Sequence, residues 1–300
     1  MKEILITGGA GFIGTNLTKK LVKKYKVTVL DLPKKIRHCQ RFKNVKYIHG
    51  DMSKVKTFDS LKTNFFKVFH FAAGTSSAES EKKKNYYLNS NIISVMNLYN
   101  WARKYKPKYI IFSSSMAVYG KEVNYLNENS DCNPCSFYGV TKLFGEKMLS
   151  NLSDYGIKIL ILRLFNVYGP GQDLKNLKQG MLSIYLAQLI NSNNLKVTGS
   201  KNRYRDFIYI DDVLNAFTII PKEKIEIFNV GTGKKTTVSE VIKLLTLSLK
   251  KNMADIKINY LKNDNFDILG SVANISKIKN IGWKPKNNLE TGISKMLKSL

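Results

Sequence analysis

Hydrophobic positions in the first half of the chain follow two alternating patterns. Short continuous apolar runs, typical of strands buried on both faces, are followed by longer segments with apolar residues at helical spacing. The runs predict strands at residues 3–7, 26–30, 45–48, 67–72, 108–113 and 158–164. The helical pattern covers residues 12–24, 54–62, 86–105 and 137–153. This alternation predicts an α/β fold built on a doubly wound parallel sheet.

The pattern becomes looser after Phe165, where Gly169-Pro170-Gly171 interrupts the chain. Helices are predicted at 180–191, 211–218, 237–250 and 290–299, and short strands at 195–198, 207–209, 226–229 and 256–260. We therefore expect a first domain at 1–165 and a smaller α/β cap at 166–300, of which segments such as 205–218 can pack back on the first domain. Ligands of open α/β sheets bind at the carboxyl ends of the strands, so we expect the ligand in the cleft between the two parts.

The turn after the first predicted strand has the sequence TGGAGFIG, in which Gly8, Gly11 and Gly14 are spaced as G-x-x-G-x-x-G. Glycine lets the backbone approach a ligand there, and the N–H groups at the helix start form an anion site. A tight turn without a ligand would also explain glycines alone. Asp31, however, ends the second strand at the spacing of a carboxylate that binds ribose hydroxyls. Together these features indicate a Rossmann-type dinucleotide site and favour NAD, because an acid repels the 2′-phosphate of NADP.

Tyr138 and Lys142 form a second candidate site at the start of the helix predicted at 137–153. They are four residues apart and so share one helix face. A lysine cation stabilises a phenolate, and so would an oxidised nicotinamide. We expect them to lower the tyrosine pKa from ~10 toward ~7, where the phenolate can accept a sugar hydroxyl proton. Ser115 ends a buried strand and can bond the same oxygen. A surface Tyr–Lys pair is the alternative, since this spacing is common by chance.

Composition argues against several other classes. With 300 residues, 43% of them hydrophobic, the chain suits a globular enzyme. It has no run of 18 apolar residues and no signal-peptide pattern, so we expect no membrane span and a cytoplasmic location. The net charge of +27 comes from 43 lysines and only six arginines, scattered along the chain. Nucleic-acid surfaces usually cluster charge and include more arginine, so we expect no nucleic-acid partner. Cys132 and Cys135 lack the further ligands of a metal site, and we predict none.

Ten segments together resemble the extended short-chain dehydrogenase/reductase superfamily, in its NAD-dependent nucleotide-sugar epimerase/dehydratase branch, over nearly the whole chain. They are TGGAGFIG (7–14), VLD (29–31), GDM (50–52), HFAAG (70–74), FSSSMAVYG (112–120), YGVTK (138–142), LRLFNVYGPGQ (162–172), RDFIYIDDV (205–213), NVGTG (229–233) and IGWKP (281–285). The resemblance implies a Rossmann-type sheet with a smaller substrate-binding cap, NAD as cofactor, and a catalytic trio of Ser115, Tyr138 and Lys142.

The resemblance also assigns contacts to the cofactor and the substrate. The residues expected to contact NAD are Gly8, Gly11, Phe12, Ile13, Gly14, Asp31, Asp51, Met52, Phe71, Ala72, Ala73, Asn91, Ser113, Tyr138, Lys142 and Phe165. The residues expected to contact a nucleotide sugar are Ser115, Asn166, Arg203, Arg205 and Ser271. Structural roles are the alternatives at three of these positions: Asp51 as a helix cap, Asn91 as a surface amide, and Arg205 in an ion pair with Asp206.

The resemblance separates reaction types at Met116 and Ala117. Dehydratases of this family have an Asp-Glu pair after the catalytic Ser/Thr, and its nucleotide-sugar decarboxylases have a Glu two residues before a Tyr-Gly, which is Tyr119-Gly120 here. Neither Met116 nor Ala117 can move a proton, so elimination is disfavoured. We expect reversible 4-epimerisation of UDP-glucose and UDP-galactose through a transient 4-keto sugar. The small Ser271 aligns where a bulky residue restricts relatives, which leaves room for UDP-GlcNAc and UDP-GalNAc.

One departure from the family keeps other nucleotides open. Close relatives carry a diphosphate-binding arginine where this chain has Asp264, with Lys262 nearby. A dehydrogenase, reductase or dehydratase of a GDP- or dTDP-sugar therefore stays an alternative, as does a non-catalytic NAD sensor, although sensors usually lack the Tyr or the Lys. We also expect a homodimer through helices 86–105 and 137–153. Four residues could form the apolar contact or belong to the core: Tyr86, Tyr87, Leu98 and Trp101.

Overall fold

The computed structural model describes residues 1–61, 63–121, 124–176, 180–261 and 269–300. The chain forms two compact units, each built from several segments. Unit 1 consists of Met1–Val118, Ser136–Arg163 and Ala216–Phe228, and unit 2 of Tyr119–Cys135, Leu164–Asn215 and Asn229–Leu300. The two expected domains are continuous, at 1–165 and 166–300, whereas both units are discontinuous, because residues 119–135 leave unit 1 and residues 216–228 return to it.

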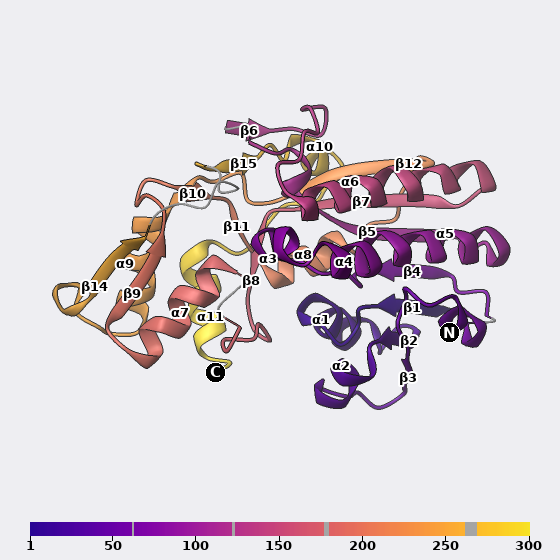
Figure 1. The fold of residues 1–300 in the computed structure, drawn as a ribbon, viewed down its shortest axis with the longest axis horizontal. Helices are drawn as coiled ribbons and strands as arrows, with labels where there is room; N and C mark the ends of the chain where they lie inside the picture. The colour runs from indigo at the N-terminus through magenta and orange to yellow at the C-terminus, as the bar shows by residue number, and fades with distance from the viewer. Residues whose placement is uncertain (62, 122–123, 177–179, 262–268) are drawn as a thin grey trace. The chain divides into compact units, whose positions relative to one another are not determined.

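Unit 1 carries nearly all of the main sheet, which has seven strands within the described ranges (Figure 1). In spatial order they are β12 (Ile225–Val230), β7 (Lys158–Leu164), β5 (Tyr109–Ser115), β4 (Lys67–His70), β1 (Glu3–Thr7), β2 (Lys26–Asp31) and β3 (Val45–His49). The registered pairs from β3 to β5 are all parallel. Strand order reverses between β1 and β4, and this switch point is where doubly wound sheets bind dinucleotides. The predicted fold class is confirmed.

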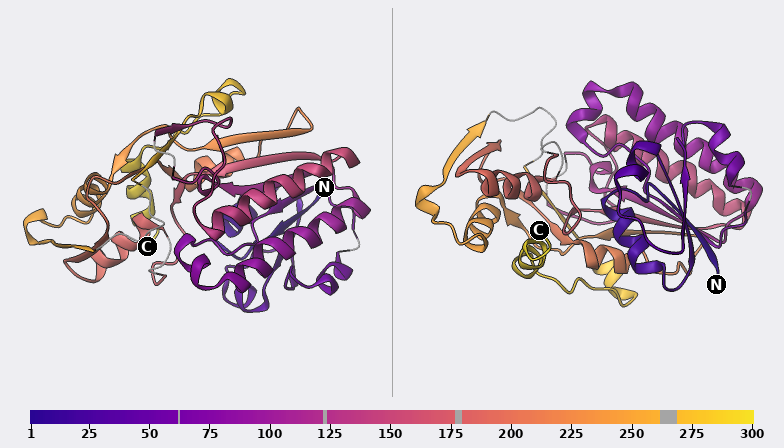
Figure 2. Two further views of the ribbon diagram at one scale, coloured as in Figure 1. Left: turned by 45° about the horizontal axis from the view of Figure 1, so that its top comes forward. Right: turned by 90° about the horizontal axis from the view of Figure 1, so that it is seen from below.

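Helices and helical turns connect these strands. They are α1 (Phe12–Leu21), α2 (Pro33–His38), η1 (Val55–Ser60), α3 (Ser77–Lys82), α4 (Lys84–Tyr87), the π-helix η2 (Leu88–Ile93), α5 (Ser94–Tyr105), η3 (Met116–Val118), α6 (Phe137–Ser150) and η4 (Asn151–Tyr155). Figure 2 shows α5 and α6 along one face of the sheet and α1 on the other. The long helix predicted at 86–105 is thus three consecutive pieces, of which the middle one is a π-helix.

Most of the residues named above for an apolar contact between two copies are buried in the core of unit 1. Tyr87, Leu98 and Trp101 are buried, and the indole Nε1 of Trp101 donates a hydrogen bond to the carbonyl of Leu61 at 2.9 Å. Only Tyr86 of the four residues named for an apolar contact is exposed, at 52%. Periodicity could not make this distinction, because a helix between a sheet and a partner would be apolar on both sides.

One predicted strand has a different place from the one expected. The strand predicted at 226–229 was assigned to the cap, but β12 is the edge strand of the main sheet beside β7. The Ile159 N–H donates to the Lys224 carbonyl at 2.9 Å where this pairing begins. A short apolar run indicates a strand but carries no information on its distant partner, which explains the wrong assignment.

Unit 2 contains short strands and helices. They are β6 (Asn124–Leu126), β8 (Asn166–Tyr168), α7 (Met181–Asn191), β9 (Asn194–Thr198), β10 (Tyr204–Arg205), β11 (Phe207–Tyr209), α8 (Ile210–Ala216), β13 (Thr236–Thr237), α9 (Val238–Ser248), η5 (Met253–Asp255), β14 (Lys257–Leu261), β15 (Ser271–Ala273), α10 (Ser276–Asn280) and α11 (Leu289–Leu297). Strands pair as β8–β11, β9–β14 and β6–β15, all parallel, and as the antiparallel β10–β13.

Asp212 anchors the C-terminal segment within unit 2. Its carboxylate accepts hydrogen bonds from the backbone N–H groups of Lys286 and Asn287, each at 3.0 Å, and its carbonyl accepts from Trp283 Nε1 at 3.2 Å. These bonds join the RDFIYIDDV segment to the IGWKP segment and the two residues after it. No helix in the part of the chain that the structure describes is long and apolar enough to span a membrane.

Candidate functional site

The glycine turn after β1 brings three backbone segments close together. Gly8 has φ +69°, and a Cβ there would lie 2.5 Å from the backbone N of Ala72, which follows β4. A Cβ on Gly14 would collide with the Gly8 carbonyl oxygen and would lie 2.6 Å from the Cα of Gly9. At Gly11, by contrast, a Cβ would meet only the Gly8 oxygen, at 3.3 Å. Gly8 and Gly14 are therefore required by packing, whereas the open side of Gly11 can admit a ligand.

The helix start beside this turn suits an anion. Gly11 is the N-cap of α1, has φ −82° and provides no side-chain cap, and the first turn contains no acidic residue. Phe12 and Ile13 are the first two residues of the helix. The N-terminal N–H groups of a helix, together with its dipole, bind phosphate groups in many dinucleotide folds. The turn thus fits the pyrophosphate of a dinucleotide.

Asp31 lies at the carboxyl end of β2, next to the turn. Its Oδ2 accepts the Ala10 N–H at 3.0 Å and its Oδ1 accepts the Leu32 N–H at 2.7 Å, so the carboxylate is held in one orientation. Burial raises the pKa of Asp31, and the two backbone N–H groups act against that rise. Each carboxylate oxygen keeps acceptor capacity, which suits ribose hydroxyls.

Asp51, after β3, uses Oδ1 to accept the Ser53 N–H at 2.9 Å, and Met52 is buried.

Asn91 is buried in the π-helix η2, not on a helix surface as its alternative role would require. Its amide N donates to the Gly74 carbonyl at 3.0 Å and to Thr141 Oγ1 at 2.9 Å. Its Oδ1 accepts the Gly74 N–H and the Ser90 hydroxyl, each at 2.7 Å. The amide therefore holds the loop after β4, the segment that contains Phe71, Ala72 and Ala73, against α6.

The predicted catalytic residues come together in unit 1. Lys142 Nζ donates to the Ser113 carbonyl at 2.8 Å and lies 5.8 Å from the centroid of the Tyr138 ring. Ser115 forms a side-chain hydrogen bond with Tyr138 and also accepts the Ala117 N–H at 3.2 Å. Lys142 and Tyr138 are both buried, which excludes the plain surface pair as an explanation.

The N-terminus of α6 is capped from two sides, which fixes the orientation of Tyr138. Ser136 Oγ accepts the Gly139 N–H at 3.2 Å. From α3, Ser80 Oγ accepts the Tyr138 N–H at 3.0 Å, and Glu81 Oε1 accepts the Phe137 N–H at 2.6 Å. Sequence reasoning missed both contacts from α3, because neither the helix nor its long-range partner has a local signal.

The ionisation of this pair differs from the expectation. Burial raises the pKa of Tyr138 to about 12, and the hydrogen bond from Ser115 only partly opposes it. Burial also lowers the pKa of Lys142 to about 8, and the charge of Glu146 acts against that fall. The expected fall of the tyrosine pKa toward ~7 is therefore not found in the protein alone. The reason is the desolvation of the phenolate, which spacing along a helix cannot reveal.

Of the predicted substrate-binding residues, Ser115 lies in unit 1, whereas Asn166, Arg203, Arg205 and Ser271 belong to unit 2, as does Phe165. Asn166 begins β8, and its side-chain amide donates to the Asp206 carbonyl at 3.1 Å. Ser271 begins β15 and is fully buried. Arg205 is buried and donates to the carbonyls of Tyr204 at 2.8 Å and Leu269 at 3.4 Å. Lys262 and Asp264 lie outside the described residues.

Arg203 and Arg205 form a buried pair of like charges. Burial first, and then the positive charge of Arg203, lower the pKa of Arg205 to about 10. Tyr185 of α7 forms a side-chain hydrogen bond with Arg203. The carboxylate of Asp206 is engaged elsewhere, because it accepts the N–H groups of Thr232, Gly233 and Ala273. The hydrogen bonds of Asp206 thus argue against its pairing with Arg205.

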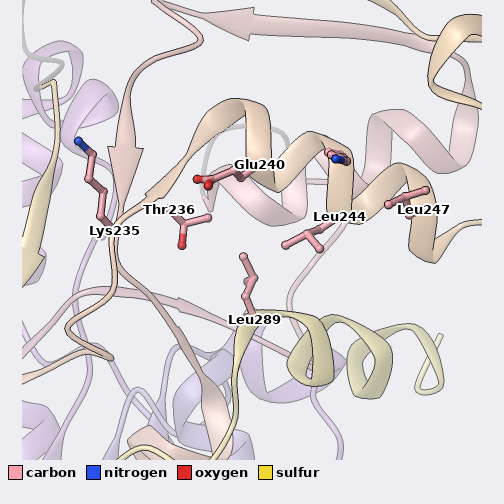
Figure 3. Close-up of a pocket in the computed structure, with 7 residues that line it drawn as sticks. Lys235, Thr236, Glu240, Leu244, Leu247 and Leu289 are labelled. Carbon is pink, nitrogen blue, oxygen red and sulfur yellow. The ribbon is translucent and has the colours of Figure 1, made fainter.

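A pocket in unit 2 lies between α9 and α11 (Figure 3). Its lining residues are Lys235, Thr236, Glu240, Lys243, Leu244, Leu247 and Leu289. Glu240 belongs to the capping box of α9 with Thr237, and none of the predicted site residues lines the pocket. We assign it no role in binding. Across the described ranges, no three His, Cys, Asp or Glu residues gather as a metal site would require.

Comparison with known proteins agrees with this geometry. The model of the NAD dependent epimerase/dehydratase family matches residues 4–231. A provisionally named UDP-glucose 4-epimerase of Methanocaldococcus jannaschii is 34% identical to this chain, and the match covers 98% of this chain and 97% of the relative's length. Enzymes named for dTDP-sugars also match, among them a dTDP-4-dehydro-6-deoxyglucose reductase of Escherichia coli, 29% identical over 99% of this chain and 97% of its own.

Two solved structures are similar over the whole chain. The UDP-N-acetylglucosamine 4-epimerase of Methanobrevibacter ruminantium, in complex with UDP-N-acetylmuramic acid, has a TM-score of 0.91 and 29% identity and covers 100% of this chain and 98% of its own. The UDP-glucose 4-epimerase of Thermotoga maritima with UDP-glucose has a TM-score of 0.91 and 30% identity, and the match covers 99% of this chain and 98% of that one.

The chain belongs to the NAD dependent epimerase/dehydratase family of extended short-chain dehydrogenases/reductases. It is an NAD-dependent enzyme that acts on nucleotide sugars.

Proposed function

We propose that this chain is a UDP-hexose 4-epimerase that interconverts UDP-glucose with UDP-galactose and UDP-GlcNAc with UDP-GalNAc. The observation that carries the proposal is the cluster of Ser115 with the buried Tyr138 and Lys142, without an acid or base at the two positions after Ser115. A phenol, a hydroxyl and a cation suffice to move one proton to and from one sugar oxygen. They offer no second proton acceptor for the elimination of water.

The cofactor-binding residues of this proposal lie in unit 1. The turn from Gly8 to Gly14 would hold the pyrophosphate, and Asp31 would accept hydrogen bonds from the hydroxyls of the adenosine ribose. Asp51 and Met52 would flank the adenine. When bound, NAD supplies a hydride acceptor, later a hydride donor, and a positive charge. The 2′-phosphate of NADP would meet the Asp31 carboxylate, so we expect a preference for NAD.

In the proposed mechanism Tyr138 accepts the proton of the sugar C4 hydroxyl and later returns it. Ser115 donates a hydrogen bond to the same oxygen, as it now hydrogen-bonds the phenol. Lys142 would contribute a positive charge close to the phenolate, and a nearby cation favours the ionised form of a phenol. Because the Lys142 pKa is about 8, this charge is present at neutral pH and is lost above that pH.

The proposed substrate class rests on unit 2. Two buried arginines repel each other, and a diphosphate would relieve that repulsion with charge-assisted hydrogen bonds. Asn166 is a further candidate for the diphosphate. The nucleotide would stay bound while the 4-keto sugar turns, so that remote binding energy retains the intermediate. The small side chain of Ser271 would leave room for an acetamido group. The similar enzymes named for UDP-glucose and UDP-N-acetylglucosamine support this choice of nucleotide.

A second candidate is an NAD-linked oxidoreductase or dehydratase of a GDP- or dTDP-sugar. One observation favours it: the sequence has no arginine after Arg205, where close relatives use one for the diphosphate. Matches to dTDP-sugar enzymes point the same way. Such an enzyme would consume added cofactor or release a sugar changed at a second carbon, and an epimerase would do neither.

We also propose a cytoplasmic homodimer. Tyr86, Leu88, Met96 and Val140 of α4, η2, α5 and α6 are exposed apolar residues, between 39% and 52% accessible. They suit a contact between two copies through α5 and α6. Of the two alternatives for Tyr87, Leu98 and Trp101, a contact between copies or the core, their burial supports the core.

The test is to incubate the purified protein without added cofactor and follow the anomeric protons of the sugar by NMR. UDP-glucose, UDP-GlcNAc, a dTDP-hexose and a GDP-hexose are compared. We expect galacto-configured products from the two UDP-sugars only. Tyr138→Phe should abolish conversion, and Tyr119→Phe is the matched control, because it removes a buried phenol that bonds Asn229 Oδ1 at 2.7 Å in unit 2. Conversion of the other nucleotides alone would overturn the proposal.

A further inference from the structure

The end of β5 is bonded to one face of α6 at three successive residues, 113–115. Ser115 and the Ser113 carbonyl engage the two predicted catalytic side chains of α6. Between them, Ser114 Oγ donates to Glu146 Oε1 at 2.5 Å. Glu146 follows Lys142 by four residues, as Lys142 follows the catalytic tyrosine, so all three lie on one face of the helix. Ser113, Ser114 and Ser115 of β5 are therefore each bonded to a different residue of α6, namely Lys142, Glu146 and Tyr138, respectively.

Arg163 of β7 holds Glu146 from the other side. Its Nε donates to Glu146 Oε1 at 3.0 Å and its Nη2 donates to Oε2 at 2.8 Å, which is a two-pronged ion pair. Glu146, Arg163 and Ser114 are each less than 5% exposed. A bidentate guanidinium–carboxylate pair fixes direction as well as distance. Glu146 thus has one orientation, set by two strands of the sheet.

Close packing leaves little room for α6 to shift along β5. A Cβ on Gly145 would lie 2.6 Å from the ring of Phe112 in β5, so the helix backbone rests directly on that ring. A shift of α6 along β5 would separate the catalytic side chains from the serines. Loss of geometry on the scale of 1 Å can cost an enzyme about a hundredfold in rate.

We propose that Glu146, held by Arg163, is a positioning residue that sets the alignment of α6 along β5 and thereby places the predicted catalytic pair. The chemistry that this pair performs rests on the proposed function. The alignment itself rests only on the hydrogen bonds above. Glu146 touches neither reacting atoms nor cofactor in this account, so it acts through the residues it positions.

The charge of Glu146 also supports the ionisation of Lys142. The titratable groups around that lysine are Tyr138 and Glu146 on its own helix, His70 on β4 and Arg163 on β7. Burial lowers the pKa of His70 to about 3, so it carries no charge at neutral pH. Glu146 is the group that raises the pKa of Lys142 against burial. Its loss should therefore let Lys142 lose its proton at lower pH.

The first experiment measures kcat and KM against pH for the full chain and for Glu146→Gln. We expect kcat to fall about tenfold or more with KM little changed, and the alkaline limb to move down by about one pH unit. Because Arg163 would be left unpaired and folding could suffer, E146M/R163M is the second variant. Apolar replacement of a whole buried pair often preserves stability. It should fold, yet show the same loss of kcat.

The control is Trp101→Phe, which removes a buried hydrogen bond of α5 in the same unit and leaves the Ser114–Glu146–Arg163 bonds in place. It should lower the unfolding temperature and leave the pH profile unchanged. If E146Q and E146M/R163M behave like this control, or keep the wild-type kcat and alkaline limb, the proposal is overturned.

An independent readout separates this proposal from the proposed function. Lysine labelled with ¹³C at Cε should give an NMR signal that titrates near pH 8 and is missing in Lys142→Arg. Its midpoint should move to lower pH in Glu146→Gln. An unchanged midpoint would overturn the proposal, and a shifted one supports it even if the wild-type protein converts none of the sugars.

Discussion

Gly11→Ala should separate cofactor binding from folding. Gly11 has φ −82°, which alanine adopts freely, and its added Cβ would meet only the Gly8 oxygen, at 3.3 Å. A movement of a few tenths of an ångström relieves that contact. Alanine is a poorer N-cap than glycine by about 0.5–1 kcal/mol. It also lowers the entropy of the unfolded chain, which contributes about 0.4–1 kcal/mol in the opposite sense. The net change in folding free energy should be within about 0.5 kcal/mol.

NAD affinity should change much more. A methyl group on the open side of the turn would enter the space proposed for the pyrophosphate and block its approach to the helix N–H groups. We expect the dissociation constant to rise at least about tenfold, or about 1.4 kcal/mol. The assay is titration with NAD by tryptophan fluorescence, together with thermal unfolding without ligand. Unchanged NAD binding in a stable Gly11→Ala would refute a pyrophosphate at this turn.

Gly14→Ala is the matched comparison. Its Cβ would collide with the Gly8 oxygen and lie 2.6 Å from the Gly9 Cα, so α1 must move by roughly 1 Å to reach ordinary contact. Overpacking of this kind costs about 1–3 kcal/mol. We expect a lower unfolding temperature and weaker NAD binding together. Stability equal to the wild type would show that the turn is looser than the structure indicates.

Three further outcomes test other parts of the site. The kcat of the wild-type enzyme should fall as pH rises through about 8, where Lys142 loses its charge, and a rate that keeps rising there would contradict the role of that charge. Arg205→Met should weaken UDP binding about 10- to 100-fold in calorimetry, since charge-assisted hydrogen bonds contribute about 1.5–3 kcal/mol; equal affinity would remove Arg205 from the diphosphate site. Ser271→Leu should lower kcat/KM for UDP-GlcNAc relative to UDP-glucose by about tenfold or more, and an unchanged ratio would exclude Ser271 from the sugar pocket.

Local pattern predicted most of the strands and helices of both units. The runs at 3–7 and 158–164 coincide with β1 and β7 because strands buried on both faces are apolar without interruption. Pairing was harder to predict. The partner of β12 is β7, about 65 residues earlier in the chain, and such contacts depend on the whole sheet.

The chemistry of the site was predicted by residue type but not by environment. The tyrosine and lysine of the predicted trio do share one helix face, as their spacing indicated. The rise of the Tyr138 pKa comes from burial, which depends on everything packed around the phenol. Glu146 and Arg163 escaped notice because their partnership joins a helix to a strand, and each residue alone resembles an ordinary charged position.

The central claim is that the enzyme removes a hydride from the sugar and returns it to the same carbon. UDP-glucose deuterated at C4, incubated with the purified protein and no added cofactor, tests it most directly. We predict UDP-galactose that retains the deuterium at C4, with no net reduction of the bound nicotinamide at the end of turnover. Loss of the label from C4, or its transfer to released reduced cofactor, would contradict epimerisation and support a net oxidoreductase.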